Sequence, residues 1–343
     1  VLLDLSAAFD TIDHSILISR LHNHLNISGT ALEWFKNYLS DRSQRIFVDG
    51  GLSKKYDVTC GVPQGSCLGP LLFIVYASDL FNVIDEYGLT PHAYADDSQL
   101  YISFKAGNMT SEMCAVNTME NCIQTIKKWM TENKLKMNDE KTKFMILGTR
   151  QQLSKHSISH LKVGNLQVFP RESVKNLGVW SDQSLSLRLQ INKTCMSSFF
   201  YLHNIKKIRK FLSADFTAML IHAFISCRLD YCNSLYYGLP ACQIVKLQRV
   251  QNAAAKLIYR QPRFAHVTPL LHDLHWLPVK FRIDFKVLSL TYKSIHGQAP
   301  QYLSDLIKIK EQSRYNLRSS SELRLAVPAT KFLSTLGSRS FTA

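Results

Sequence analysis

The sequence predicts an α+β protein in which an antiparallel sheet with packed helices precedes a helical region. Short apolar runs between turn residues dominate the first half, which is typical of strands. Apolar residues three or four positions apart dominate the second half, which is typical of amphipathic helices. Charge follows the same division, because residues 1–185 hold 18 basic and 19 acidic residues whereas residues 186–264 hold 12 and 2.

The size and composition of the chain indicate a folded protein of roughly two domains. We place boundaries that give residues 1–183, a basic helical region at 184–264, and a C-terminal helical region at 265–343 with a poorly ordered tail. A chain with 46% hydrophobic and 20% charged residues is neither disordered nor collagen-like. The net charge of +15 makes a polyanion the first partner to consider.

No secretory signal and no apolar run long enough to span a membrane can be found in the sequence. We therefore expect a nuclear or cytoplasmic protein with no membrane partner. Both ends are expected to be cuts within a longer protein, because neither shows the features of a natural terminus. The oligomeric state is left open.

The predicted strands are short. They lie at residues 2–5, 45–48, 56–59, 91–94, 98–102, 144–147, 161–168 (a hairpin turning at 164–165) and 176–179. One predicted helix follows a capping box at 30–33, and an apolar helix to about Val83 follows a Ser66 cap. A series of successive amphipathic helices is predicted at 186–259, and further helices at 110–134 and 279–296. In the last of these, one helix face carries Phe281, Phe285, Leu288 and Tyr292.

The eight cysteines are scattered, and we expect them to be reduced thiols. His222, Cys227, Cys232 and Cys242 lie close enough in the sequence to raise the question of zinc. Their spacing fits no Cys-x2-Cys pattern, so ordinary packing of small apolar side chains is the simpler interpretation.

Three aspartates form a candidate metal site. Asp4 follows an apolar strand, and Asp96 with Asp97 lies at the tip of a predicted hairpin. Three carboxylates brought together at strand ends repel one another unless cations hold them, and a pair of Mg²⁺ ions does so in enzymes that transfer phosphoryl or nucleotidyl groups. An Asp-Asp turn alone is more often structural.

The ordered combination of motifs is more specific. The segments are 3–10 (LDLSAAFD), 61–70 (GVPQGSCLGP), 94–97 (YADD), 137–143 (MNDEKTK), 176–178 (NLG), 247–253 (LQRVQNA) and 275–279 (HWLPV). In these motifs the sequence resembles the reverse transcriptases of non-LTR (LINE-type) retrotransposons over essentially its whole length.

The resemblance implies a right-hand polymerase with an α/β palm at 1–183 followed by a helical thumb, and with the fingers that precede the first motif missing. It implies RNA-directed DNA polymerase activity, in which two Mg²⁺ ions, or Mn²⁺ in their place, are held by Asp4, Asp96 and Asp97. The partners would be an RNA template, a DNA primer and dNTPs.

The resemblance also assigns binding roles. Phe9 matches the ring that excludes a ribose 2′-hydroxyl, and packing in a core is the alternative explanation for a phenylalanine here. Gln64, Gly65 and Tyr94 match residues around the nucleotide, and Lys141 matches a lysine near the triphosphate. Leu177 and Gly178 match the turn that grips the primer.

Other positions receive weaker assignments. Lys206, Lys207, Arg209 and Lys210 form the densest basic cluster, which could contact nucleic-acid phosphates, serve nuclear import, or be a solvated helix face. Asp10 is expected to be structural, and His275, Trp276 and Pro278 are given no catalytic role.

Two other functions stay open from the sequence. The first is a catalytically defective, nucleic-acid-binding remnant of such an element. The second is an RNA-directed RNA polymerase, which shares the palm geometry. Metal-dependent activity would separate the first from the leading interpretation, and the choice between dNTPs and rNTPs would separate the second.

Overall fold

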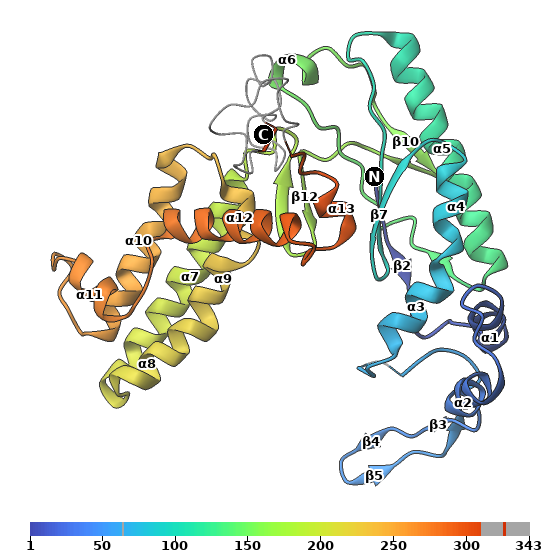
Figure 1. Ribbon diagram of the computed structural model, residues 1–343, viewed down its shortest axis with the longest axis horizontal. Coiled ribbons are helices and arrows are strands. Elements are labelled where there is room, and N and C mark those ends of the chain that lie inside the picture. Colours follow the sequence, from blue (N-terminus) through green and yellow to red (C-terminus); the bar gives the residue numbers. More distant parts are fainter. Residues whose placement is uncertain (64, 310–324, 327–343) are drawn as a thin grey trace, which may run out of the picture. The chain divides into compact units, whose positions relative to one another are not determined.

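The structure is a computed structural model that describes residues 1–63, 65–309 and 325–326. The chain divides into two compact units, Val1–Leu177 and Gly178–Ala343, each with its own hydrophobic core (Figure 1). The α+β class is confirmed, because strands concentrate in the first unit and helices dominate the second. The tail predicted to be poorly ordered lies outside the described residues.

The first unit contains a three-stranded antiparallel sheet in the order β1-β8-β7. Its strands are β1 (Leu2–Leu3), β8 (Asp97–Tyr101) and β7 (Thr90–Tyr94). The predicted hairpin at 91–102 is thus confirmed, with Tyr94 paired to Asp97 across the turn. The sheet joins residues almost a hundred positions apart, because Leu3 pairs with Ser98.

The first unit also contains short two-stranded pairs. They are β2 (Leu5–Ser6) with β9 (Lys136–Met137), β3 (Ser43–Gln44) with β6 (Tyr56–Asp57), β4 (Phe47–Val48) with β5 (Gly51–Leu52), and β10 (Leu161–Val163) with β11 (Leu166–Val168). Strand β12 (Ser173–Asn176) comes last in this unit.

Helices α1 and α5 of the first unit begin at short polar side chains that cap them. Asp13 accepts hydrogen bonds from the N–H groups of Ser15 and Ile16 at the start of α1 (His14–Asn23), and Asn108 caps α5 in the same way. The remaining helices are α2 (Gly29–Leu39), α3 (Gly69–Ala77), α4 (Asp79–Asp85), α5 (Met109–Glu132) and α6 (Arg150–Leu153).

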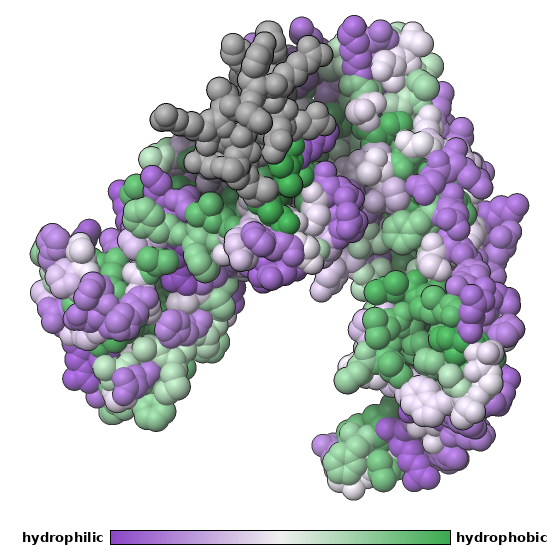
Figure 2. Space-filling model, in the orientation of Figure 1, coloured by the Kyte–Doolittle hydropathy of each residue, from purple (hydrophilic) through white to green (hydrophobic). Residues whose placement is uncertain are grey.

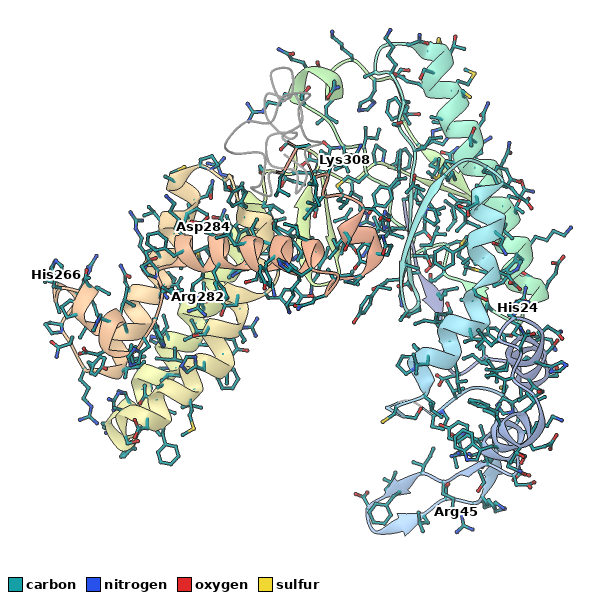
Figure 3. All side chains as sticks on the ribbon, in the orientation of Figure 1. His24, Arg45, His266, Arg282, Asp284 and Lys308 are labelled. Atoms are coloured by element: carbon teal, nitrogen blue, oxygen red, sulfur yellow. The ribbon has the colours of Figure 1, made fainter. Side chains whose placement is uncertain are left out.

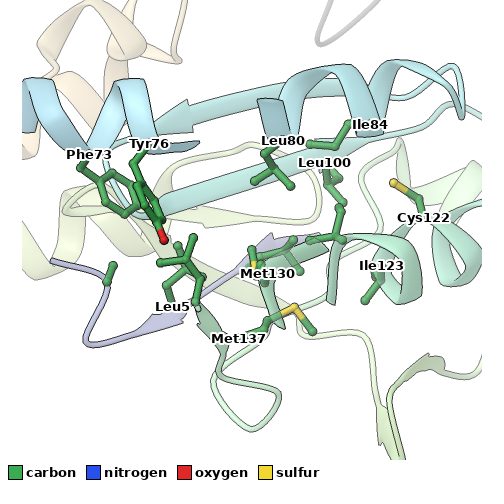
Figure 4. Close-up of a cluster of buried hydrophobic side chains, with 14 of the residues drawn as sticks. Leu5, Phe73, Tyr76, Leu80, Ile84, Leu100, Cys122, Ile123, Met130 and Met137 are labelled. Carbon is green, nitrogen blue, oxygen red and sulfur yellow. The ribbon is translucent and has the colours of Figure 1, made fainter. Parts of the chain in front are cut away.

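Side chains from the sheet, from α3 and α4, and from α5 form the core of the first unit. Figure 4 shows Leu5 and Met137 from the strand pair beneath Tyr76, while Leu100 of β8 lies between the helices. Ile126 of α5 is fully buried. Burying such aliphatic side chains contributes about 1.5–3 kcal/mol each, so this core fixes the strands on which the acidic residues sit.

Part of the apolar surface of the first unit stays exposed. Leu71 and Ile74 of α3 are more than half exposed, and hydrophobic side chains gather over α3 in Figure 2. Phe47 and Leu52 of the β4–β5 hairpin are exposed as well.

The second unit begins with β13 (Val179–Asp182) and continues almost entirely as helices. They are α7 (Arg188–Ile208), η1 (Arg209–Phe211), α8 (Ala214–Ile221), the π-helical η2 (His222–Ser226), α9 (Cys227–Asp230), η3 (Asn233–Tyr236), α10 (Ala241–Ile258), α11 (Thr268–Asp273), α12 (Val279–Ile295) and α13 (Gln301–Ser304).

The core of the second unit takes side chains from both sides of residue 264. Ile191 of α7, Val250 of α10 and Ile283 of α12 are all buried in it. Arg282 of α12, labelled in Figure 3, forms an ion pair with Asp230 of α9.

Several element predictions were wrong in detail. The capping box at 30–33 does not cap a helix, because left-handed Gly29 (φ +58°) turns the chain into α2 ahead of Thr30. The apolar helix to Val83 breaks into α3 and α4 at Ser78, whose hydroxyl donates to the carbonyl of Val75.

Two predicted strands also failed. At 144–147 only Phe144 forms a bridge, and its partner is Pro170, which has no N–H to extend a ladder. At 176–179 the strand is interrupted by left-handed Leu177 and Gly178 (φ +43° and +83°).

The apolar helix face predicted within 279–296 lies on α12 and is exposed, since Phe281, Phe285, Leu288 and Tyr292 are 54–67% exposed.

Candidate active site

The three aspartates come to one end of the sheet. Asp4 follows β1 directly, and because Leu3 pairs with Ser98, the next residue on each strand brings Asp4 beside Asp97. Asp96 lies in the two-residue turn that closes the β7–β8 hairpin, where Ala95 is left-handed (φ +53°). The backbone of Asp4 is fixed from the other side, because its carbonyl accepts the N–H of Asn138 (2.8 Å).

The charge of this group is incompletely balanced. Burial raises the pKa of Asp97 above its usual value, and the negative charges of Asp96 and Asp4 raise it further. Lys143 opposes the shift but does not reverse it. The three carboxylates are therefore close enough to repel one another, and a cation bound among them would be stabilised.

Two lysines face the carboxylates. The ammonium of Lys141 lies 3.6 Å from a carboxylate oxygen of Asp4, which places this predicted residue beside the first aspartate. Lys143 is bonded to β1 through its backbone, exchanging two hydrogen bonds with Leu2 (2.8 and 3.0 Å). Sequence reasoning missed Lys143, which follows Lys141 by two residues in the same motif.

The loop that carries these lysines is held by its own polar residues. Asn138 accepts the N–H of Lys141 through its side chain (3.2 Å) and the hydroxyl of Thr142 through its carbonyl (3.0 Å). Asp139 forms an ion pair with Lys127 of α5. The lysine side chains therefore leave the loop from a fixed backbone.

Phe9 joins the first two motifs. Its ring is half-buried against Phe73 of α3, with the centroids 5.0 Å apart, and its carbonyl accepts the N–H of Val62 (2.9 Å). Gly61 is needed at this junction, since its φ is +82° and an added Cβ would lie 2.8 Å from the carbonyl oxygen of Asp10. Residues 61 and 62 are therefore held against Phe9 and Asp10.

Two of the other predicted nucleotide-binding residues, Gly65 and Tyr94, are exposed to solvent. Gly65 is exposed with φ +79° and open space around it. Tyr94 is 69% exposed on β7, next to the turn that holds Asp96. Gln64 lies outside the described residues.

The predicted primer-gripping turn is linked to the hairpin by a buried residue that the sequence did not single out. Gln99 of β8 is 8% exposed, and its amide donates to the side chain of Asn176 (3.0 Å), immediately before Leu177 and Gly178. Tyr101 donates in turn to Gln99. A polar residue at an inward position of a strand is the only signal that could have indicated it.

A family model described as reverse transcriptase (RNA-dependent DNA polymerase) matches residues 1–181, a region that contains all these residues except those of the basic cluster. The chain belongs to the reverse transcriptase family. The resemblance to reverse transcriptases of non-LTR retrotransposons is thereby confirmed, because the similar curated proteins described next come from such elements.

Three proteins of Drosophila melanogaster are similar to this reverse transcriptase chain. The probable RNA-directed DNA polymerase from transposon BS is 26% identical over 83% of the chain and 31% of its own length. The enzyme from mobile element jockey is 25% identical over 55% of the chain and 20% of its length, and that from transposon X-element is 24% identical over 96% and 36%. The chain thus spans about a third of the first of these.

Among solved structures, telomerase from Candida albicans in complex with a fragment of telomeric RNA is similar to the reverse transcriptase chain. The TM-score is 0.37 at 12% identity, over 81% of this chain and 50% of that one.

The four residues of the basic cluster in the second unit differ in their exposure to solvent. Lys206, Lys207 and Lys210 are exposed, as a phosphate-binding role would require. Arg209 is only 7% exposed, and its guanidinium donates to the carbonyls of Leu257, Ile258 and Leu212. Predicting Arg209 as a nucleic-acid contact was wrong, because its donors already bind the protein's own backbone.

The structure also bears on possible metal binding by cysteines and on membrane-spanning helices. Within residues 1–63, 65–309 and 325–326, no group of three or more His, Cys, Asp or Glu side chains is arranged so that it could hold a metal ion, and this includes Asp4, Asp96 and Asp97. All eight cysteines are free thiols. No helix in the described part of the chain is both long and apolar enough to cross a membrane.

Proposed function

We propose that this chain carries the polymerising centre of an RNA-directed DNA polymerase. Such a centre transfers a nucleotide from a dNTP to the 3′-hydroxyl of a DNA primer paired with an RNA template. The observation that carries the proposal is the approach of Asp4 to Asp96 and Asp97 at one end of the sheet. Family membership supports it, since the matched region includes all three residues.

The donor set fits Mg²⁺. This ion takes few protein carboxylates and leaves its other positions to water and phosphate oxygens, so three aspartates that form no closed cage are a suitable set. Burial raises the pKa of Asp97 most, and the negative charges of Asp96 and Asp4, which a divalent cation would neutralise, raise it further. Bound there, two such ions would activate the primer hydroxyl and neutralise the leaving pyrophosphate, and Mn²⁺ could replace them.

The protein's own residues would position the substrates. Lys141, and Lys143 beside it, are placed to attract the negative triphosphate toward the aspartates. The ring of Phe9, fixed against Phe73, would leave no room for a ribose 2′-hydroxyl. Gln64, Gly65 and Tyr94 would line the same nucleotide site.

We assign the first unit to the palm of a right-hand polymerase and the second unit to the thumb with the region that follows it. Leu177 and Gly178 stand at the boundary between the two units and would grip the primer end. The exposed lysines 206, 207 and 210 would contact phosphates of the template and primer. We assign fingers to none of the chain.

A primer-extension assay tests the proposal. The chain is incubated with an RNA template, an annealed DNA primer, dNTPs and Mg²⁺, and Asp96→Asn is compared with the control Asp49→Asn. Asp49 is an exposed aspartate in a turn with φ +48°, which asparagine tolerates. We expect weak, metal-dependent extension that Asp96→Asn abolishes and Asp49→Asn preserves.

Each other outcome favours a different function. Extension that survives Asp96→Asn would refute the metal-site assignment. Binding of template–primer without any extension would favour the catalytically defective remnant. Incorporation of rNTPs as fast as dNTPs would favour an RNA-directed RNA polymerase.

A further inference from the structure

We propose that the second unit binds single-stranded nucleic acid on a basic–aromatic patch at the joined ends of α7 and α10. The patch consists of five cations and two rings: Lys206, Lys207, Lys210, Phe211, Arg260, Arg263 and Phe264. The inference deepens the proposed function and rests on it, since the strand would be an unpaired part of the template or the primer.

Arg209 builds the patch by joining two distant segments of the chain. Its guanidinium donates to the carbonyls of Leu257 (3.0 Å) and Ile258 at the end of α10 and to that of Leu212 (2.7 Å). In return, Arg260 donates to the carbonyl of Arg209 (3.3 Å). These bonds bring the residues of η1 beside the loop that follows α10.

The loop after α10 is also fixed from within. The ammonium of Lys256 donates to the carbonyl of Arg263 (2.5 Å), which holds the backbone next to Phe264. His266, labelled in Figure 3, belongs to the same loop two residues further on. Phe264 and Arg263 therefore project from a backbone that the protein itself positions.

No cation of the patch forms an ion pair within the described ranges, and the surrounding basic region is poor in acids. Residues 186–264 contain two acidic residues, Asp215 and Asp230. Asp230 is paired with Arg282, and Asp215 forms no ion pair within the described ranges. The pKa of Arg209 is lowered by burial and by the neighbouring positive charge of Arg260, as expected where cations crowd together. A polyanion would relieve this repulsion.

The two aromatic rings among the cations indicate which kind of polyanion the patch binds. Phe264 is 92% exposed and Phe211 is 77% exposed, with the ammonium of Lys210 located 4.8 Å from the Phe211 ring centroid. Exposed aromatic rings amid cations suit unpaired bases, which stack on the rings while their phosphates meet the lysines and arginines. Bases in a duplex are already stacked, and an acidic protein segment would use the cations without requiring the rings.

Fluorescence anisotropy with the whole chain tests the inference. The probes are a labelled oligouridylate, an oligothymidylate of equal length, and a duplex of that length, each titrated at several salt concentrations. The variants are Phe211→Ala with Phe264→Ala, Lys206→Ala with Lys207→Ala, and the control Phe285→Ala, an exposed ring on α12 (63%) outside the patch. Thermal melting establishes that each variant is folded.

We expect the double phenylalanine variant to lose at least about tenfold in affinity for both single strands and less than about twofold for the duplex. The double lysine variant should lower the salt slope for single strands by about 1.4, since each phosphate contact contributes about 0.7. The control should bind like the wild type. A preference for either single strand would identify the patch as serving the RNA or the DNA.

Three results would overturn the inference. They are undiminished single-strand affinity in the double phenylalanine variant, equal losses for the duplex, and equal losses in the Phe285→Ala control. Failure of the proposed function gives a different result. Extension would then survive Asp96→Asn, whereas single-strand binding at the patch would be the same in that variant and the wild type.

Discussion

Replacing Arg209 by alanine should loosen the second unit, whereas replacing its exposed neighbour Lys207 should not. Arg209 is the buried member of the basic cluster, and it donates to three backbone carbonyls at the ends of η1 and α10. Alanine removes all three hydrogen bonds and opens a space where the side chain lay. Lys207 is exposed, so its replacement changes charge without removing packing.

The magnitude follows from the number and kind of bonds. A hydrogen bond to a charged group contributes about 1.5–3 kcal/mol, which would give about 4.5–9 kcal/mol for three. Water can reach carbonyls at helix ends and recovers part of this, so we expect a loss of about 3 kcal/mol in the second unit. Lys207→Ala should stay within about 0.5 kcal/mol of the wild type.

Hydrogen exchange measured by mass spectrometry is the suitable assay. A chain of two units need not unfold in one step, so a single unfolding midpoint would mix their stabilities. Peptides that cover the end of α10 should exchange about 100-fold faster in Arg209→Ala, while peptides from α5 of the first unit should not change. Unchanged exchange together with weaker RNA binding would refute this reasoning and restore Arg209 as a phosphate contact.

Three further predictions concern the first unit. Phe9→Val should increase rNTP incorporation relative to dNTP in primer extension, and unchanged discrimination would leave Phe9 with a packing role alone. Hydrogen bonds from Ser157 and Gly107 lower the pKa of Glu112, so the stability they confer is present above its unfolded pKa and lost as pH falls through the lowered value. Glu112→Gln should therefore melt earlier than the wild type at pH 7 and similarly below the lowered pKa. Gln99→Leu should raise the KM for template–primer more than that for dNTP, and equal changes in both would argue against a positioning role toward the primer turn.

Elements that depend on local patterns were predictable from the sequence. The β7–β8 hairpin, the hairpin at 161–168 and the long helix α5 follow from alternation, from turn residues and from helical spacing. The failures arose where one residue changes the backbone course, as Ser78 does between α3 and α4 and as Pro170 does beside Phe144. Such effects require knowledge of the partner, which periodicity does not contain.

The candidate site was predictable in its residues but not in their neighbours. Motif order identified Asp4, Asp96 and Asp97, because these carry the chemistry wherever the fold places them. Lys143 and Gln99 were missed because each acquires its position through a residue remote in sequence. Arg209 shows the converse error, since a basic run in the sequence does not say which member turns inward.

The motifs are also connected to one another in the structure, which explains why they belong together. The first motif meets the second through Gly61, whose close approach to Asp10 excludes any side chain. It meets the 137–143 motif through Lys141 beside Asp4. The hairpin of Asp96 and Asp97 meets the 176–178 motif through the hydrogen bond from Gln99 to Asn176. Because each link spans two motifs, substitutions at linked residues should be non-additive, and the aspartates take their geometry from the whole set of contacts.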